Sequence, residues 1–259
     1  MGAHGLRRLL LAAAVALTVL AVLWDAGLFE QGRAARGLRN FAVFFGEMVP
    51  PEADAGLVET LLLSLWETVQ MAWAGTVLGA LLALPLAVLA TEHLATRWVA
   101  RPVRALLAGV RTVPSILWAI VFVVVVGLGP LAGILALAAY TTGYLGKLFY
   151  EALEAVDPEV LDAVRATGAT RLQVARHAAV PEAGNALLSQ GIFAFEYNVR
   201  ASSILGLVGA GGIGFYLLRF VELLEYAKLA TAILLLFGLV VAVDALSRVV
   251  RRRFLAGRA

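Results

Sequence analysis

Residues 112–146 form a run of 35 residues that contains no charged side chain. A single helix of that length would extend for about 52 Å, far beyond the roughly 30 Å hydrocarbon core of a bilayer. Because Gly127, Gly129 and Pro130 lie in the middle of the run and such residues interrupt helices, we expect two spans there. Four other apolar runs are candidate spans, at residues 9–24, 57–91, 183–205 and 226–247. The sequence therefore predicts an all-α integral membrane protein with about six transmembrane helices.

The composition supports this class and excludes several others. Hydrophobic residues make up 61% of the chain and charged residues 15%, whereas soluble domains carry about a quarter charged residues. The chain has no cysteine, which excludes disulfides and thiolate metal sites, and its three histidines are scattered. The net charge of +3 does not indicate a nucleic-acid partner, because membrane proteins concentrate arginine in cytoplasmic loops.

Basic residues are distributed unequally between the segments that join the predicted spans. If the N-terminus is cytoplasmic, fourteen lie on the inside: Arg7, Arg8, Arg97, Arg101, Arg104, Lys147, Arg165, Arg171, Arg176, Arg248, Arg251, Arg252, Arg253 and Arg258. Five lie on the outside: Arg33, Arg36, Arg39, Arg219 and Lys228. Since an excess of Lys and Arg marks the cytoplasmic side, we predict that both termini are cytoplasmic.

The sequence predicts three parts. Residues 1–56 would hold one transmembrane helix and an outside segment, in which arginines and phenylalanines predict an amphipathic helix on the membrane surface. The alternative for the first span is a cleaved signal peptide, but we expect the span to be retained, because no clear small-x-small cleavage site follows Trp24 and Asp25. Residues 57–253 would form the membrane core, and residues 254–259 a cytoplasmic tail.

A polar segment, residues 151–182, separates two of the apolar runs. It is charged and largely composed of helix-forming residues, and Gly168 in its centre predicts a turn between two short helices. A membrane protein has little use for such a segment unless a soluble partner docks on it. We therefore expect this segment to be a docking site on the cytoplasmic side.

A glycine-rich sequence lies between the last two spans. Gly209, Gly211 and Gly214 satisfy the G-x-G-x-x-G pattern, but a dinucleotide site needs that pattern between a strand and a helix, and no alternating strands are predicted. Together with Gly212, these glycines predict a re-entrant turn that lines a cavity at the outer end of a span. The chain also lacks the G-x-x-x-x-G-K-[ST] phosphate loop, so any ATP must bind to a separate subunit.

The fifth predicted span contains Glu196, Asn198 and Arg200 within an apolar sequence. Charged residues inside a span cost a few kcal/mol each and almost always face a bundle interior or a wet cavity. Glu196 and Arg200 have the helical spacing of an ion pair, and Ser203 falls on the same face. Two interpretations stay open: a structural pair that joins helices, or the polar wall of a translocation path in which Arg200 attracts an anion.

The polar segment resembles the EAA loop of binding-protein-dependent ABC importer permeases. That family has a glutamate–alanine–alanine sequence followed by a glycine and later a proline, and here the positions are Asp162, Ala163, Val164, Gly168 and Pro181. Asp162 and Val164 depart from the family pattern but keep the acid and a small apolar residue. We therefore expect docking to be preserved.

A second resemblance narrows the subgroup. Residues 195–200 and 204–214 are similar to phosphonate-type permeases, and the resemblance to importer permeases covers about residues 57–253. It implies a type I importer permease fold, a second copy of the permease, a cytoplasmic ABC ATPase dimer that binds ATP and magnesium, and a periplasmic or lipid-anchored binding protein. The permease itself would bind no cofactor, perform no covalent chemistry and lie in a bacterial cytoplasmic membrane.

The same resemblance assigns roles to the site residues. Residues 158–178 would insert a coupling helix into the ATPase, with Asp162 either contacting that partner or capping its own helix. The binding protein would deliver an oxyanion of the phosphonate, phosphite or phosphate class near residues 206–214. The alternatives are an importer for another small solute, such as methionine, and a proton-coupled carrier with Glu196 as the proton site.

Overall fold

The computed structural model of the chain describes residues 3–27 and 32–255, and it contains only helices and connections within these ranges. The chain divides into two compact units, Met1–Pro51 and Glu52–Ala259. The first unit holds α1 (Ala3–Asp25), most of whose described apolar side chains are exposed, and α2 (Arg33–Glu47). In α2, Phe41 and Phe45 lie with ring centroids 4.4 Å apart, on a helix that also carries Arg36 and Arg39. This composition agrees with the amphipathic helix that the sequence predicts.

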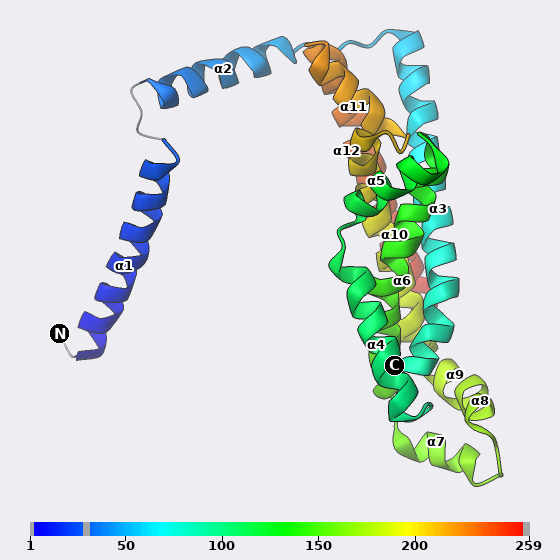
Figure 1. Cartoon of the computed structure of the whole chain (residues 1–259). Helices are drawn as coiled ribbons and strands as arrows, with labels where there is room; N and C mark the ends of the chain where they lie inside the picture. Colours follow the sequence, from blue (N-terminus) through cyan, green and yellow to red (C-terminus); the bar gives the residue numbers. More distant parts are fainter. Residues whose placement is uncertain (1–2, 28–31, 256–259) are drawn as a thin grey trace. The chain divides into compact units, whose positions relative to one another are not determined.

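The second unit is a bundle in which α3 (Ala55–Ala90), α6 (Pro130–Glu154), α10 (Gly184–Leu205) and α12 (Tyr226–Leu255) run along a common axis (Figure 1). The contact between α3 and α6 depends on two glycines of α3. A Cβ at Gly75 would lie 2.5 Å from Leu137 Cβ, and one at Gly79 would lie 2.6 Å from Thr141 Cβ. Small residues allow membrane helices to approach closely, so these glycines fix the centre of the bundle.

The predicted break at residues 127–130 is confirmed. Gly127 and Gly129 adopt φ of 90° and 125°, and Pro130 is the first residue of α6, where its missing N–H costs nothing. The span before this break differs from the prediction. It consists of α4 (Arg97–Thr112) and α5 (Ser115–Val126), which are bent by 85° at Val113 and Pro114. With 12 residues, α5 extends for only about 18 Å, too short to cross a bilayer alone.

The other spans follow the prediction closely. Four described helices are long and apolar enough to cross a membrane, and the number rises to six if each bent pair counts as one span. The second bent pair joins α10, with its 3₁₀ extension Gly206–Val208, to α11 (Ile213–Glu222) at an angle of 46°. The last helix, α12, extends beyond the predicted span, because the helix continues through the arginine-rich sequence that follows the apolar part.

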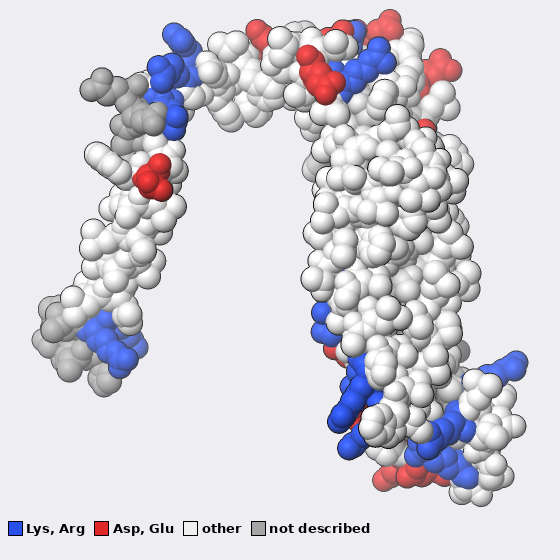
Figure 2. All heavy atoms as spheres, in the orientation of Figure 1, with Lys and Arg blue, Asp and Glu red and all other residues white. Residues whose placement is uncertain are grey.

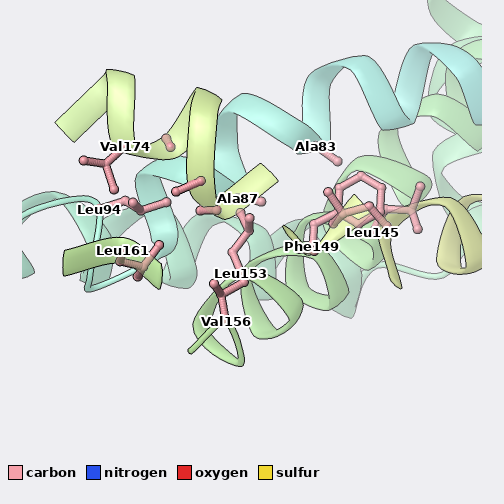
Figure 3. Close-up of a cluster of buried hydrophobic side chains, with 14 of the residues drawn as sticks. Ala83, Ala87, Leu94, Leu145, Phe149, Leu153, Val156, Leu161 and Val174 are labelled. Atoms are coloured by element: carbon pink, nitrogen blue, oxygen red, sulfur yellow. The ribbon is translucent and has the colours of Figure 1, made fainter. Parts of the chain in front are cut away.

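The polar segment folds at one end of the second unit, beyond the ends of α3 and α6 (Figure 1). It contains α7 (Pro158–Arg165), α8 (Arg171–Val174), a π-helical turn (Ala175–Ala179) and α9 (Val180–Glu182). Leu161 and Val174 are buried in the same hydrophobic cluster as Ala87 and Leu153 (Figure 3). The segment is therefore attached to the membrane bundle by an apolar core that the two share.

Candidate functional site

The polar segment presents an exposed face that is held in place by hydrogen bonds. Asp157 caps α7 by accepting a hydrogen bond from the Glu159 backbone N–H at 2.9 Å, so of the two roles given to Asp162, capping its own helix is excluded. Asp162 lies inside α7 and accepts a hydrogen bond from Arg165 at 2.7 Å. Arg165 also donates to the carbonyl of His93 at 2.7 Å, which connects α7 to the segment after α3.

The remaining residues of the EAA-like pattern lie around the turn. Gly168 adopts φ +81° with open space around its Cα, as a tight turn between α7 and α8 requires. Ala163 and Pro181 are exposed, whereas Val164 is half-buried against the hydrophobic cluster. The Asp162 side chain is 67% exposed. Its carboxylate and the turn at Gly168 therefore lie on one surface that is accessible to a partner protein.

The charged residues of α10 form a network with α12. Buried Glu196 accepts a hydrogen bond from Arg251, and Arg200 lies 3.2 Å from Asp244. The Glu196–Arg200 pair expected from their spacing is present but long, at 4.0 Å. The principal partner of Glu196 is therefore 55 residues away in the sequence. Sequence reasoning missed Arg251, although an acid within a span and an arginine-rich last helix are a signal for such a pair.

Asn198 and Ser203 lie on different sides of α10. Asn198 is 1% exposed and donates hydrogen bonds to Thr76 Oγ1 and Thr141 Oγ1, at 2.8 and 2.9 Å, so that it joins α3, α6 and α10. Ser203 donates to the carbonyl of Arg200 at 2.7 Å. Of the four candidate path residues, Arg200 alone has a side chain about half exposed, at 51%.

Three tyrosines lie near this exposed side of α10. Tyr140 and Tyr144 of α6 stack with Tyr197 of α10, and the three ring centroids are 5.8, 6.3 and 6.4 Å apart. These distances are typical of aromatic packing. Tyr197 precedes Arg200 by three residues, so both lie on one face of α10.

The glycine loop lies at the end of the second unit opposite to the polar segment (Figure 1). Gly209, Gly211 and Gly212 adopt φ of 86°, 87° and 70°. The Gly212 N–H donates to Glu67 Oε1 at 3.0 Å, and the Ile213 N–H donates to Thr68 Oγ1 at 2.9 Å. These bonds satisfy the free N–H groups at the start of α11 and fix the loop against α3.

Glycine is also required where the loop meets its own helices. A Cβ at Gly214 would overlap the carbonyl oxygen of Ser203, and one at Gly206 would lie 2.6 Å from the Gly211 oxygen. The Gly129 N–H donates to the Gly209 oxygen at 2.9 Å, which connects the loop to the break before α6. The G-x-G-x-x-G pattern thus arises from close backbone packing between membrane helices.

This arrangement agrees with a known protein family. The family of binding-protein-dependent transport system inner membrane components matches residues 75–256, which is well over half of the chain. The chain belongs to this family. As an inner membrane component, it is a multi-pass transport protein of a bacterial membrane.

Individual relatives of this inner membrane component are permeases, and a solved transporter chain has a similar fold. It is 37% identical over 237 residues to the phosphite transport system permease protein PtxC of Stutzerimonas stutzeri, covering 91% of the chain and 86% of that protein. It is 37% identical over 213 residues to the phosphate-import permease protein PhnE of Mycolicibacterium smegmatis, covering 81% of the chain and 39% of that protein. The solved inward-facing MetNI methionine ABC transporter has a chain that matches with a TM-score of 0.68 and 27% identity, covering 77% of this chain and 98% of that one.

In this inner membrane component, Gly168 is the position at which the turn of the polar segment can be tested. We expect Gly168→Arg to reduce transport by the assembled system at least about tenfold, because an L side chain is disfavoured at φ +81° and its bulk would occupy the surface between α7 and α8. Membrane insertion should be unchanged, since nothing surrounds the position. Solute uptake and the amount of inserted protein are the two measurements.

Asparagine is the matched control at this position, because it tolerates the left-handed region better than other side chains. Gly168→Asn should keep most of the uptake. Normal uptake by Gly168→Arg would show that this turn is not needed for coupling.

Proposed function

We propose that the chain is the membrane-spanning subunit of an ATP-driven importer for oxyanions of the phosphite, phosphonate and phosphate class. The observation that supports this most strongly is the 37% identity over 91% of the chain to a phosphite permease. A second relative is a phosphate-import permease, also 37% identical. The similarity to a methionine transporter chain is lower, at 27%, so the oxyanion class is preferred to methionine.

The proposed mechanism assigns the chain no catalysis and no cofactor of its own. Two copies form the path, and a separate ABC ATPase dimer binds ATP and magnesium. The exposed face around Asp162 and Gly168 is the proposed contact with the ATPase. A binding protein delivers the oxyanion near the glycine loop at the opposite end. A proton-coupled carrier explains less, because it has no use for the surface that α7 and α8 form.

The distribution of charge supports the proposed orientation. Figure 2 shows Lys and Arg gathered at the end of the second unit that holds the polar segment, and a middle region almost free of charge on the face drawn. Glu52, Asp54 and Glu225 lie at the other end, near the start of α3 and of α12. The positive-inside rule therefore supports our proposal that the polar segment and both termini are cytoplasmic.

Uptake by the complete transporter tests the solute class. The chain, its ATPase and its binding protein would be reconstituted in vesicles with ATP, and the uptake of labelled phosphite, methylphosphonate, phosphate and methionine would be compared. We expect at least one oxyanion to be taken up about tenfold faster than methionine. Uptake of methionine without uptake of any of the three oxyanions would contradict the proposal.

A further inference from the structure

A small cavity lies between α4 and α6, away from the network of α10 and α12. Its volume is about 50 Å³, enough for a few water molecules and thus for a phosphate-sized group. Six residues line it: Arg104, Leu107, Ala108, Arg111, Lys147 and Tyr150. Three of these side chains are basic and none is acidic. The cavity is therefore a cationic site that is separate from the charged network around Arg200.

The backbone explains why these side chains meet. Arg104 and Arg111 are seven residues apart on one face of α4, with Leu107 between them. Gly143 and Gly146 of α6 allow α4 to approach closely, because a Cβ at Gly143 would lie 2.9 Å from the Arg111 backbone nitrogen. A Cβ at Gly146 would lie 2.6 Å from Leu107 Cδ2. The glycines bring the α4 arginines beside Lys147 on the same side of α6.

The three cations differ in their partners. Arg104 binds Glu154 and lies 4.8 Å above the ring of Tyr150, and Lys147 lies 3.2 Å from Glu151. By contrast, no carboxylate of the described residues lies within 4.0 Å of the Arg111 guanidinium.

Arg111 also has an unusual position. It lies in the last turn of α4, directly before the bend inside a candidate span. The helix dipole favours a cation there by less than about 1 kcal/mol when exposed, whereas an arginine within a span costs more than that. Arg111 is exposed, so its guanidinium is open to an anion that enters the cavity.

We propose that this cavity binds a tetrahedral oxyanion of the phosphate class, with Arg111 as its principal charged ligand and Lys147 as a second. The planar guanidinium of arginine forms paired charge-assisted hydrogen bonds with such groups. The cavity lies toward the end that holds the polar segment, since Arg104 also donates to the Ala90 carbonyl at the end of α3. One source of the anion is the transported solute on its way to the cytoplasm, which rests on the proposed function. The other source is the phosphate of a membrane lipid.

The experiment measures anion binding to the full-length chain purified in dodecyl maltoside, a detergent without phosphate. Calorimetric titrations use sodium phosphite in one arm and dioctanoyl phosphatidic acid in the other. Arg111→Gln should weaken binding about tenfold or more, and Arg111→Lys should restore part of it. Arg252→Gln removes the same charge from an exposed position on α12 that does not line the cavity, and it should bind like the parent.

The two arms distinguish the source of the anion. The expected pattern with phosphite supports a site for the transported solute, and the same pattern with phosphatidic acid alone supports a lipid site. Equal binding by the parent and Arg111→Gln in both arms, or no binding by the parent in either, would overturn the proposal. Lys147→Gln serves as the second variant if Arg111→Gln does not fold, as judged by circular dichroism and size exclusion.

The binding experiment and the uptake experiment can fail independently of one another. A transporter that imports phosphite while Arg111→Gln leaves binding unchanged would refute the cavity and keep the proposed function. A transporter that imports no oxyanion would refute the proposed function, and the phosphatidic acid arm would still decide whether the cavity binds phosphate.

Discussion

Replacing Arg251 with alanine is expected to lower the free energy of unfolding by about 3–5 kcal/mol. Arg251 is the principal partner of the Glu196 carboxylate, whose side chain is only 7% exposed. Removing Arg251 leaves the desolvated Glu196 charge with only the longer contact to Arg200 at 4.0 Å, and that poorly compensated charge carries most of the cost. The measurement is reversible unfolding of the chain in detergent, followed by circular dichroism.

Arg252 provides the matched control for this change. It is adjacent in sequence and exposed, so Arg252→Ala should alter stability by less than about 0.5 kcal/mol. Glu196→Gln combined with Arg251→Ala should recover part of the loss, since the unpaired charge is then absent. Equal effects of Arg251→Ala and Arg252→Ala would show that the Glu196 pair does not stabilise the packing of α10 against α12.

Gly214→Ala is expected to abolish transport and to destabilise the fold by about 3 kcal/mol or more. The added Cβ would overlap the Ser203 carbonyl oxygen, and Gly206 Cα would lie 2.8 Å away. Both neighbours belong to the backbone, so relief requires a shift of α10 or α11, and overpacking of this kind costs a few kcal/mol. Uptake by the reconstituted transporter and thermal unfolding of the purified chain are the measurements.

Gly191→Ala makes the same chemical change in α10, where nothing lies within 4 Å of the added Cβ. It should be neutral or stabilising by up to about 1 kcal/mol, because alanine favours the helix. Similar losses in Gly191→Ala and Gly214→Ala would mean that close packing at the glycine loop is not what the function requires.

Most of the fold follows from apolar length and from helix-breaking residues. The break between α5 and α6 is predictable because glycine and proline interrupt helices. In the structure, Gly127 and Gly129 adopt positive φ directly before Pro130. The sequence does not predict the bent pair of α4 and α5. Arg97, Arg101 and Arg104 suggest a polar loop, but Arg104 forms an ion pair with Glu154 of α6, a helix that is far away in the sequence and packs against α4.

For the polar residues of α10, the sequence predicts contacts within the helix but not contacts with other helices. Helical spacing predicts that Glu196 and Arg200 approach one another, and they do so at 4.0 Å. Spacing cannot predict that Arg251 is the principal partner of Glu196, because that contact depends on how α12 packs. It also cannot show that Asn198 donates to the threonines of α3 and α6, since those contacts depend on how three helices pack together.

We propose that this inner membrane component forms a path that a separate ATPase operates through the segment around Gly168. Accumulation of labelled phosphite would be measured in vesicles that contain the chain and its binding protein, with and without the ATPase subunit. We expect accumulation only when the ATPase and hydrolysable ATP are both present. Accumulation of phosphite by vesicles that lack the ATPase would contradict the proposal.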